Sequence, residues 1–279
     1  MSTTWHLQSV GCLLQLTAEC CAKGMLDTKW FFSPRPLNSP AGRLFCFPFA
    51  GGGCGTFLEW PRYFGEDLEI ICVQLPGRGK RFSEQPFTSV PPLVTELGRL
   101  FVNCRGVPFA FFGHSMGSLI AYELACHLQM AGGPQPSCIF VSGTEAPQLV
   151  QEKEYFISLS DSELVEVVRR MNGMPDEVLK NPELLELLLP VLRADFILTG
   201  TYKHTDYILS CGITAFCGSD DKEATVSDVH QWKRRTAGEF RMHTITGDHF
   251  FINSARDQVL ELVKDNLRTC FDEPRGAPE

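Results

Sequence analysis

The sequence has no hydrophobic run long enough to cross a bilayer. Its longest apolar stretches, such as Leu184–Leu189 with Glu186 inside it, are far shorter than the roughly 18 residues that a membrane-spanning helix needs. Basic residues are also too few for electrostatic binding to nucleic acid or an anionic membrane, because 25 Lys and Arg stand against 33 Asp and Glu. With a net charge of −8, we expect neither nucleic acid nor a membrane as a partner.

The 12 cysteines have neither the paired spacing of a zinc site nor the pattern of a disulfide framework. Several of them, such as Cys46, lie inside apolar runs, where a free cysteine behaves as a small hydrophobic residue. A secretory signal is also not indicated, because only Lys23 and Lys29 are basic among the first 34 residues and the apolar stretch Val10–Leu16 contains Gln15. We therefore expect a cytoplasmic protein without a bound metal.

Between residues 41 and 270, short apolar runs alternate with helical patterns. Most of these runs are continuously apolar, as are parallel strands that helices cover on both faces. The candidate strands are Leu44–Phe47, Ile70–Leu75, Phe109–Phe112, Cys138–Ser142, Ile213–Cys217 and Met242–Ile245. The pattern predicts a doubly wound α/β domain with a mostly parallel sheet. Residues 1–40 lack periodicity and end in a proline-rich stretch, so we expect a weakly structured leader there and a C-terminal tail at residues 271–279.

One stretch, at about residues 150–210, interrupts the alternation because it contains helical patterns and no convincing strand. Ser160 and Glu163 have the spacing of a capping box at the start of a helix. Asn181 and Pro182 supply an N-cap and a first-turn proline for a helix that we expect to run through Leu189. An all-helical insertion into an α/β sheet predicts a lid.

The sharpest functional signal is the segment Gly113-His114-Ser115-Met116-Gly117. It follows the apolar run Phe109–Phe112 and precedes the helical pattern Ser118–Met130, which is the strand, turn and helix context that a nucleophile elbow requires. The serine must occupy a sharp turn, and glycines on both sides remove the Cβ clashes that such a turn creates. We therefore predict that Ser115 is a catalytic nucleophile; the alternative is a structural turn with an incidental serine.

A serine hydroxyl needs a base, and in this context a carboxylate and a histidine should follow it in the chain. His249 comes directly after the last candidate strand and before a C-terminal helix, so we predict that it is the base. Asp220 and Asp221 both follow the candidate strand Ile213–Cys217, and only one of them can face the imidazole. The position favours Asp221 as the acid, whereas Asp248 is expected to be a loop residue.

The oxyanion of a tetrahedral intermediate needs hydrogen-bond donors. One should be the backbone N–H of Met116, which follows the nucleophile. The other should come from the glycine-rich turn Phe47–Gly53, where we favour Ala50 and keep Phe49 as the alternative. This turn lacks the Lys-Ser/Thr of a P-loop and the spacing of a dinucleotide-binding loop, so oxyanion stabilisation is favoured over phosphate binding.

These motifs resemble those of the type II thioesterases of fatty acid, polyketide and nonribosomal peptide synthesis, which include the animal medium-chain S-acyl fatty acid synthase thioesterase. The resemblance covers about residues 43–265, in the family's order. The segments that carry it are Phe47–Gly52, Leu75–Arg78, Phe111–Gly117, Ser142–Gly143 with Ala146–Pro147, Leu192–Asp195 and Gly247–Phe250.

The resemblance implies an α/β-hydrolase fold and hydrolysis of acyl thioesters held on the phosphopantetheine arm of an acyl carrier protein. It places the nucleophile at Ser115, the base at His249 and the acid at Asp221, and it implies no cofactor. Apolar residues of the insertion, Leu188 among them, are expected to cover an acyl chain. A carboxylesterase or lipase acting on oxygen esters stays open because the same triad serves it, as does a hydrolase-fold binding protein without turnover. The sequence does not decide the oligomeric state, for which we expect a monomer.

Overall fold

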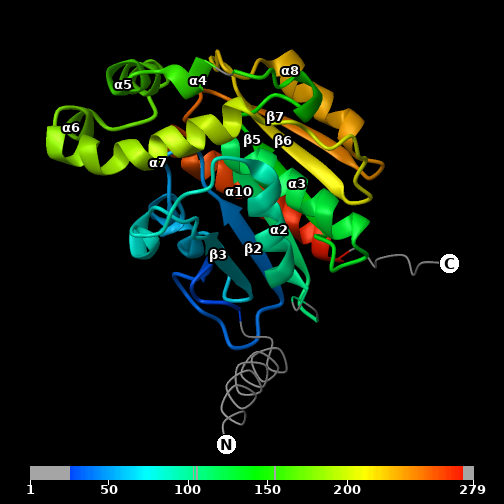
Figure 1. Cartoon of the computed structure of the whole chain (residues 1–279). Coiled ribbons are helices and arrows are strands. Elements are labelled where there is room, and N and C mark those ends of the chain that lie inside the picture. The colour runs from blue at the N-terminus through cyan, green and yellow to red at the C-terminus, as the bar shows by residue number, and fades with distance from the viewer. Residues whose placement is uncertain (1–25, 103, 105, 154, 273–279) are drawn as a thin grey trace, which may run out of the picture.

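The computed structural model describes residues 26–102, 104, 106–153 and 155–272, and a seven-stranded sheet runs through their centre (Figure 1). The strand order is β1-β3-β2-β4-β5-β6-β7, and every neighbouring pair is parallel except β1 and β3. The strands are β1 (Phe31–Phe32), β2 (Gly42–Phe47), β3 (Leu68–Val73), β4 (Phe109–His114), β5 (Cys138–Ser142), β6 (Gly212–Gly218) and β7 (Phe240–Ile245). All six predicted strands are present, and the mostly parallel sheet is confirmed.

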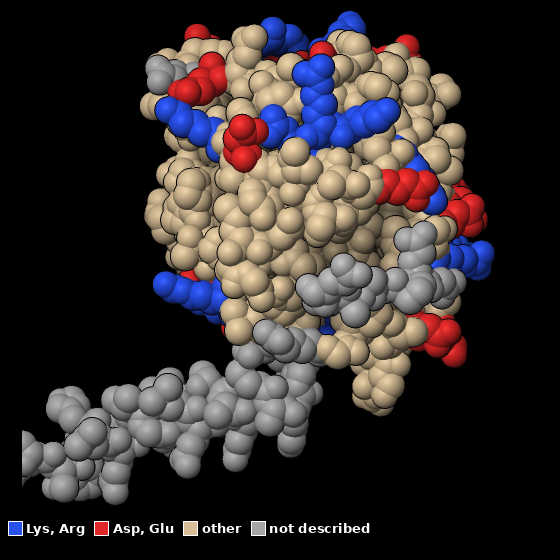
Figure 2. Space-filling view, turned by 90° about the vertical axis from the view of Figure 1, so that its right-hand side faces the viewer, with Lys and Arg blue, Asp and Glu red and all other residues tan. Residues whose placement is uncertain are grey.

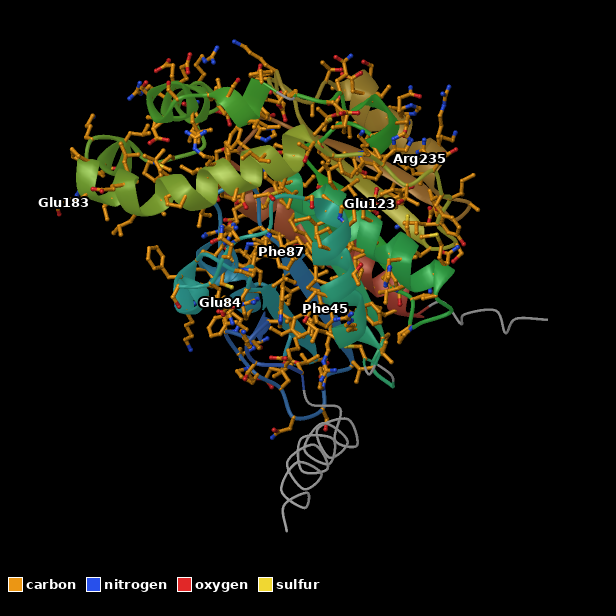
Figure 3. All side chains as sticks on the ribbon, viewed as in Figure 1. Phe45, Glu84, Phe87, Glu123, Glu183 and Arg235 are labelled. Atoms are coloured by element: carbon orange, nitrogen blue, oxygen red, sulfur yellow. The ribbon has the colours of Figure 1, made fainter. Side chains whose placement is uncertain are left out.

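The inner strands β2, β4 and β5 are buried on both faces of the sheet, and successive residues of a strand point to opposite sides. In β2, Phe45 and Phe47 belong to the core on one face, and Leu44 and Cys46 belong to the core on the other. Phe45, labelled in Figure 3, packs against the ring of Phe101 with the ring centroids 4.7 Å apart. This burial on both sides explains why the strands are continuously apolar in sequence.

Helices cover the two faces in the doubly wound arrangement that the alternating pattern predicts. Helices α2 (Val90–Phe101), α3 (Met116–Met130) and α8 (Val226–His230) pack on one face, and α10 (Arg256–Asp272) packs on the other, preceded by the short α9 (Phe251–Ser254). Figure 1 shows α2 and α3 in front of the sheet and α10 behind it. The two layers hold the strands so that their carboxyl ends meet at one edge, where the turn after β4 lies.

The strand β1 lies inside the segment that we expected to be a weakly structured leader. It pairs antiparallel with the end of β3, and the buried ring of Phe31 lies 5.2 Å from Phe45 and 5.4 Å from Phe101 between ring centroids. A two-residue strand has no periodicity that a sequence pattern can reveal, so its place depends on these contacts. Residues 1–25 of the predicted leader and residues 273–279 of the predicted tail lie outside the described residues, and α10 includes residues 271 and 272.

The described part of the insertion, residues 150–153 and 155–210, contains helices and no strand, as predicted. Its helices are α4 (Tyr155–Ser158), α5 (Asp161–Arg170), α6 (Asp176–Leu179) and α7 (Pro182–Gly200). The capping box is present, because the Ser160 N–H donates to the Glu163 carboxylate at 2.8 Å and the Glu163 N–H donates to Ser160 Oγ at 3.3 Å. Figure 1 shows these helices above the carboxyl ends of the strands.

Helix α7 is longer than predicted, since it continues beyond Leu189 and across Pro190 to Gly200. A proline inside a helix removes one backbone hydrogen bond and costs about 3 kcal/mol. Burial of Leu192 and Phe196 in an apolar cluster with α4 and α5 offsets this cost. The outer half of α7, before Pro190, extends away from the sheet, with Glu183 near its far end in Figure 3.

No helix among the described residues is both long and apolar enough to cross a membrane.

On the face shown in Figure 2, charged residues of both signs lie in the upper part and around the edge, while the centre carries neither sign.

Candidate active site

Ser115 occupies a sharp turn between β4 and α3. Its backbone angles are φ +52° and ψ −120°, and a positive φ is uncommon for a residue with a side chain. The Ser115 N–H donates to the carbonyl of Ser142 at 2.7 Å, which ties the turn to the neighbouring strand β5. The surrounding strands therefore hold the serine in a strained conformation that places its hydroxyl at the edge of the sheet.

The glycines on either side of Ser115 are needed because backbones approach them closely. A Cβ atom on Gly117 would lie 2.2 Å from the carbonyl oxygen of Phe47, and one on Gly113 would lie 2.3 Å from the carbonyl group of Gly117. These contacts join β2, β4 and α3. The clash expected from the sequence is thus present, and it is made by backbone atoms that cannot move aside.

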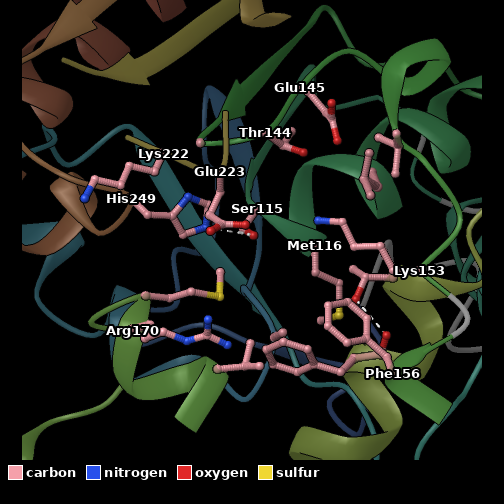
Figure 4. Close-up of a pocket in the computed structure, with 18 of the residues that line it drawn as sticks. Ser115, Met116, Thr144, Glu145, Lys153, Phe156, Arg170, Lys222, Glu223 and His249 are labelled. Carbon is pink, nitrogen blue, oxygen red and sulfur yellow. Dashed lines mark hydrogen bonds between the residues drawn. The ribbon is translucent and has the colours of Figure 1, made fainter. Parts of the chain in front are cut away.

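The structure brings Ser115, His249 and Asp221 together in one hydrogen-bonded chain. Figure 4 shows His249 beside Ser115. His249 Nε2 lies 3.1 Å from Ser115 Oγ, and His249 Nδ1 lies 2.9 Å from Asp221 Oδ2. His249 and Asp221 are buried, while Ser115 is partly exposed. Three residues that are 134 and 28 positions apart in sequence therefore meet at the carboxyl edge of the sheet.

The structure also separates the three aspartates of this region. Burial alone would raise the pKa of Asp221, but hydrogen bonds from His249 and from the backbone N–H groups of Glu223 and Ala224 outweigh it and keep that pKa below its usual value. Asp220 is exposed and accepts a hydrogen bond from Ser219. Asp248 accepts hydrogen bonds from the Phe250 N–H and from Asn172, as a loop residue.

His114, next to the serine, is fully buried. Burial, with a smaller contribution from His249, lowers the pKa of His114 to about 3. Its Nδ1 lies 2.9 Å from Ser142 Oγ, and its ring centroid lies 5.4 Å from that of His249. At neutral pH, His114 is therefore an uncharged packing residue beside His249.

The backbone N–H groups predicted to stabilise an oxyanion lie on the same cavity as Ser115. Ala50 and Met116 both line it, and among the described residues neither N–H donates a hydrogen bond. The turn after β2 is closed by a hydrogen bond from the Gly52 N–H to the Phe49 carbonyl at 2.8 Å. Ala50 and Met116 thus each have a backbone N–H without a hydrogen-bond partner among the described residues.

The cavity beside Ser115 has a volume of about 580 Å³, which is within the range of small-molecule sites. Apolar side chains of the insertion form part of its wall, as expected for an acyl site. They include Phe156, Val167, Met171 and Phe196. Leu188 is not among the lining residues and packs instead in the apolar cluster of the insertion.

Several charged residues of the cavity wall were not found by the sequence analysis. Glu145, Lys153 and Arg170 line the cavity, as Figure 4 shows, and burial raises the pKa of Glu145. Glu145 comes three residues after the end of β5, and its position beyond a parallel strand is the signal that would have indicated it. The described residues contain no group of three or more His, Cys, Asp or Glu that could hold a metal ion.

Comparison with known proteins identifies the family. The family model of the thioesterase domain matches residues 42–267. Gramicidin S biosynthesis protein GrsT of Aneurinibacillus migulanus is 37% identical over 241 residues, covering 86% of this chain and 94% of that protein. The medium-chain S-acyl fatty acid synthase thioesterase of Anas platyrhynchos is 34% identical over 242 residues, covering 82% and 93%.

Solved structures agree with this assignment. The type II thioesterase BorB from the borrelidin biosynthetic cluster superposes with a TM-score of 0.80 at 31% identity, covering 88% of this chain and 99% of that one. The sheet described above thus has the α/β-hydrolase arrangement of known thioesterases. Since the family model spans most of the chain, the protein belongs to the thioesterase family, as a thioester hydrolase of the type II group.

Proposed function

We propose that this thioesterase releases acyl groups from the phosphopantetheine arm of a carrier protein through an acyl-enzyme on Ser115. The observation that carries the proposal is the chain of hydrogen bonds from Ser115 Oγ through His249 to Asp221, placed at the wall of a cavity of about 580 Å³. This arrangement supplies a nucleophile, a base and room for an acyl group.

In the first half of the reaction, His249 Nε2 accepts the proton of the Ser115 hydroxyl while Oγ attacks the thioester carbonyl carbon. The negative charge that develops on the carbonyl oxygen is stabilised by the backbone N–H groups of Met116 and Ala50. When the intermediate collapses, the carbon–sulfur bond breaks and His249 returns the proton to the leaving thiolate. The acyl group then remains as an ester on Ser115.

In the second half, a water molecule gives a proton to His249 and attacks the ester carbonyl. The same backbone donors stabilise the second oxyanion, and its collapse releases the free acid and reprotonates Ser115. Asp221 holds the imidazole with its Nδ1–H toward the carboxylate and stabilises the imidazolium that forms in both halves. Its pKa, kept below the usual value by its hydrogen bonds, keeps this carboxylate ionised at neutral pH.

A carrier-bound substrate is supported by the names and the similarity of the relatives. One takes part in gramicidin S biosynthesis and another is a fatty acid synthase thioesterase. The helical insertion at residues 150–210 acts as a lid in this proposal, because its apolar side chains form part of the cavity wall. A carrier's long arm needs only a channel to Ser115 and a modest docking surface.

Hydrolysis by wild type and Ser115→Ala of acyl-carrier, acyl-CoA and p-nitrophenyl ester substrates tests the proposal. We expect faster turnover of carrier thioesters than of oxygen esters and a loss of about 10⁴-fold or more in the variant. A fluorophosphonate probe should label wild type and not Ser115→Ala. Preference for oxygen esters would favour a carboxylesterase or lipase, and absence of both turnover and labelling would favour a binding protein.

The partnership of Ser115 and His249 has its own test. Members of a triad act as a unit, so His249→Ala and the double variant should each be about as slow as Ser115→Ala. A double variant much slower than either single variant would show that the two residues act independently.

We also propose a cytoplasmic, monomeric enzyme. In support, burial raises the pKa values of the Cys46 and Cys138 thiols, so these cysteines serve as small apolar core residues that need no oxidation. Cell fractionation tests the location. Light scattering of the purified protein tests the oligomeric state, and a mass of twice the chain's would overturn the monomer.

A further inference from the structure

A buried ion pair links the helical insertion to the loop after β3. Arg78 Nη1 and Nη2 donate to Asp195 Oδ2 and Oδ1, both at 2.8 Å, in the parallel two-bond geometry that is strongest for arginine and carboxylate. The side chain of Asp195, on α7, is 2% exposed, and that of Arg78 is 11% exposed. Taking both charges of such a pair out of water costs free energy, so we look for a role of the pair other than stabilising the fold.

The same two side chains also hold the turn that carries Ala50. The Gly51 N–H donates to Asp195 Oδ2 at 2.7 Å, and Arg78 Nη1 donates to the Gly52 carbonyl at 2.9 Å. The peptide group between Ala50 and Gly51 is therefore fixed by a carboxylate that comes from the insertion, 144 residues away in sequence. It adjoins the Phe49–Ala50 peptide group, which carries the Ala50 N–H and whose carbonyl accepts a hydrogen bond from the Gly52 N–H at 2.8 Å.

The packing around this turn leaves little freedom. Gly51 has φ +74°, a left-handed conformation, and a Cβ atom there would lie 2.4 Å from Leu192 Cδ2 on α7. Asp195 and Leu192 lie nearly one helical turn apart, so one face of α7 both binds and covers the turn. In Figure 1 this inner end of α7 lies above the sheet, whereas the outer end extends beyond it.

We propose that Asp195, held in place by Arg78, is a positioning residue that aims the Ala50 N–H at the reacting carbonyl oxygen. The proposal rests on the proposed function, in which Ala50 is an oxyanion donor. It makes catalysis depend on docking of the inner half of α7. Release of Asp195 frees the Ala50–Gly51 peptide group and, through Ala50, loosens the adjoining Phe49–Ala50 peptide group, which carries the Ala50 N–H. The insertion then completes the catalytic site in addition to covering the acyl chain.

Asp195→Asn should lower kcat about 10- to 100-fold, because a misplacement of about 1 Å in a catalytic group has an effect of this size. The KM for a short acyl-CoA should change little, since Asp195 is not among the residues that line the cavity. A trifluoromethyl ketone, whose adduct on Ser115 carries an oxyanion, should bind more weakly by a similar factor. The thioether analogue of the acyl-CoA, which forms no oxyanion, should bind as tightly as to wild type.

A double variant separates positioning from the burial of charge. Arg78→Met with Asp195→Leu leaves no unpaired buried charge, so thermal stability should return toward that of wild type. Leucine offers the Gly51 N–H no acceptor, so kcat and ketone affinity should stay low in this double variant. Asp161→Asn is the matched control, because it breaks the Arg193–Asp161 pair that links the same helix α7 to α5, and it should leave kcat and ketone affinity unchanged.

If the double variant regains both stability and kcat, Asp195 has only a structural role and the inference is wrong. The inference also fails if Asp195→Asn keeps the kcat and the ketone affinity of wild type. In that case the proposed function still stands, as long as the wild-type protein hydrolyses acyl thioesters. Absence of turnover and of Ser115 labelling in wild type would instead overturn the proposed function.

Discussion

Acid should destabilise this protein through His114, because the folded chain buries that imidazole in its neutral form. Burial, and to a smaller extent the neighbouring His249, lowers the pKa of His114 from its ordinary 6.5 to about 3. Between these two pH values the unfolded chain binds a proton that the folded chain does not bind. The free energy of unfolding therefore falls as the pH falls from about 6.5 toward 3.

The size of the effect follows from proton linkage. Each pH unit within this window removes about 1.4 kcal/mol. Since protonation of the unfolded chain begins near pH 6.5, lowering the pH from 7 to 5 removes about 2 kcal/mol through His114 alone. This is a substantial part of the roughly 5–15 kcal/mol that stabilises a typical domain.

Urea unfolding of wild type and His114→Asn at pH 7, 6 and 5 measures this contribution. Asparagine keeps a polar group near Ser142 Oγ, the hydrogen-bond partner of His114, but does not titrate. We expect the variant to be less stable at pH 7 and the difference from wild type to shrink by about 2 kcal/mol at pH 5. A difference that stays constant over this range would refute the reasoning, because both proteins would then bind the same number of protons on unfolding.

Three further predictions concern the catalytic site and its walls. Asp221→Asn should lower kcat by up to about 10⁴-fold because His249 loses the acceptor that orients it, whereas Asp220→Asn should keep a kcat near that of wild type. A steady-state assay at pH 7 compares the two variants, and equal losses of kcat would contradict the geometry. Val167→Phe, on the cavity wall, should shift the preference among acyl-CoA substrates toward shorter chains by about 1–3 kcal/mol in kcat/KM. Leu188→Phe, outside the wall, should leave the ratio of kcat/KM values between short and long acyl chains unchanged. Gly117→Ala should destabilise the fold by more than about 2 kcal/mol in urea unfolding, since its Cβ would lie 2.2 Å from the Phe47 carbonyl oxygen, and wild-type stability would show that the backbones can separate.

Local signals in the sequence were enough for six of the seven strands and for the turn at Ser115. A strand buried on both faces must be apolar at every position, so the runs ending at Phe47 and Ser142 identify β2 and β5 without knowledge of their neighbours. The glycines around Ser115 are likewise readable, because the turn needs them wherever the chain folds. His249 and the two candidate acids follow from the rule that side chains beyond parallel strands gather at one edge.

Tertiary structure alone decided which side chains meet at that edge. Asp220 and Asp221 are adjacent and chemically identical, and only the path of the chain after β6 turns Asp221 toward His249 and leaves Asp220 in solvent. The extension of α7 past Pro190 and the bond from Asp195 to Gly51 depend on packing between segments far apart in sequence. No short-range pattern encodes such contacts, because their free energy arises only when both partners are already held in place by the rest of the fold.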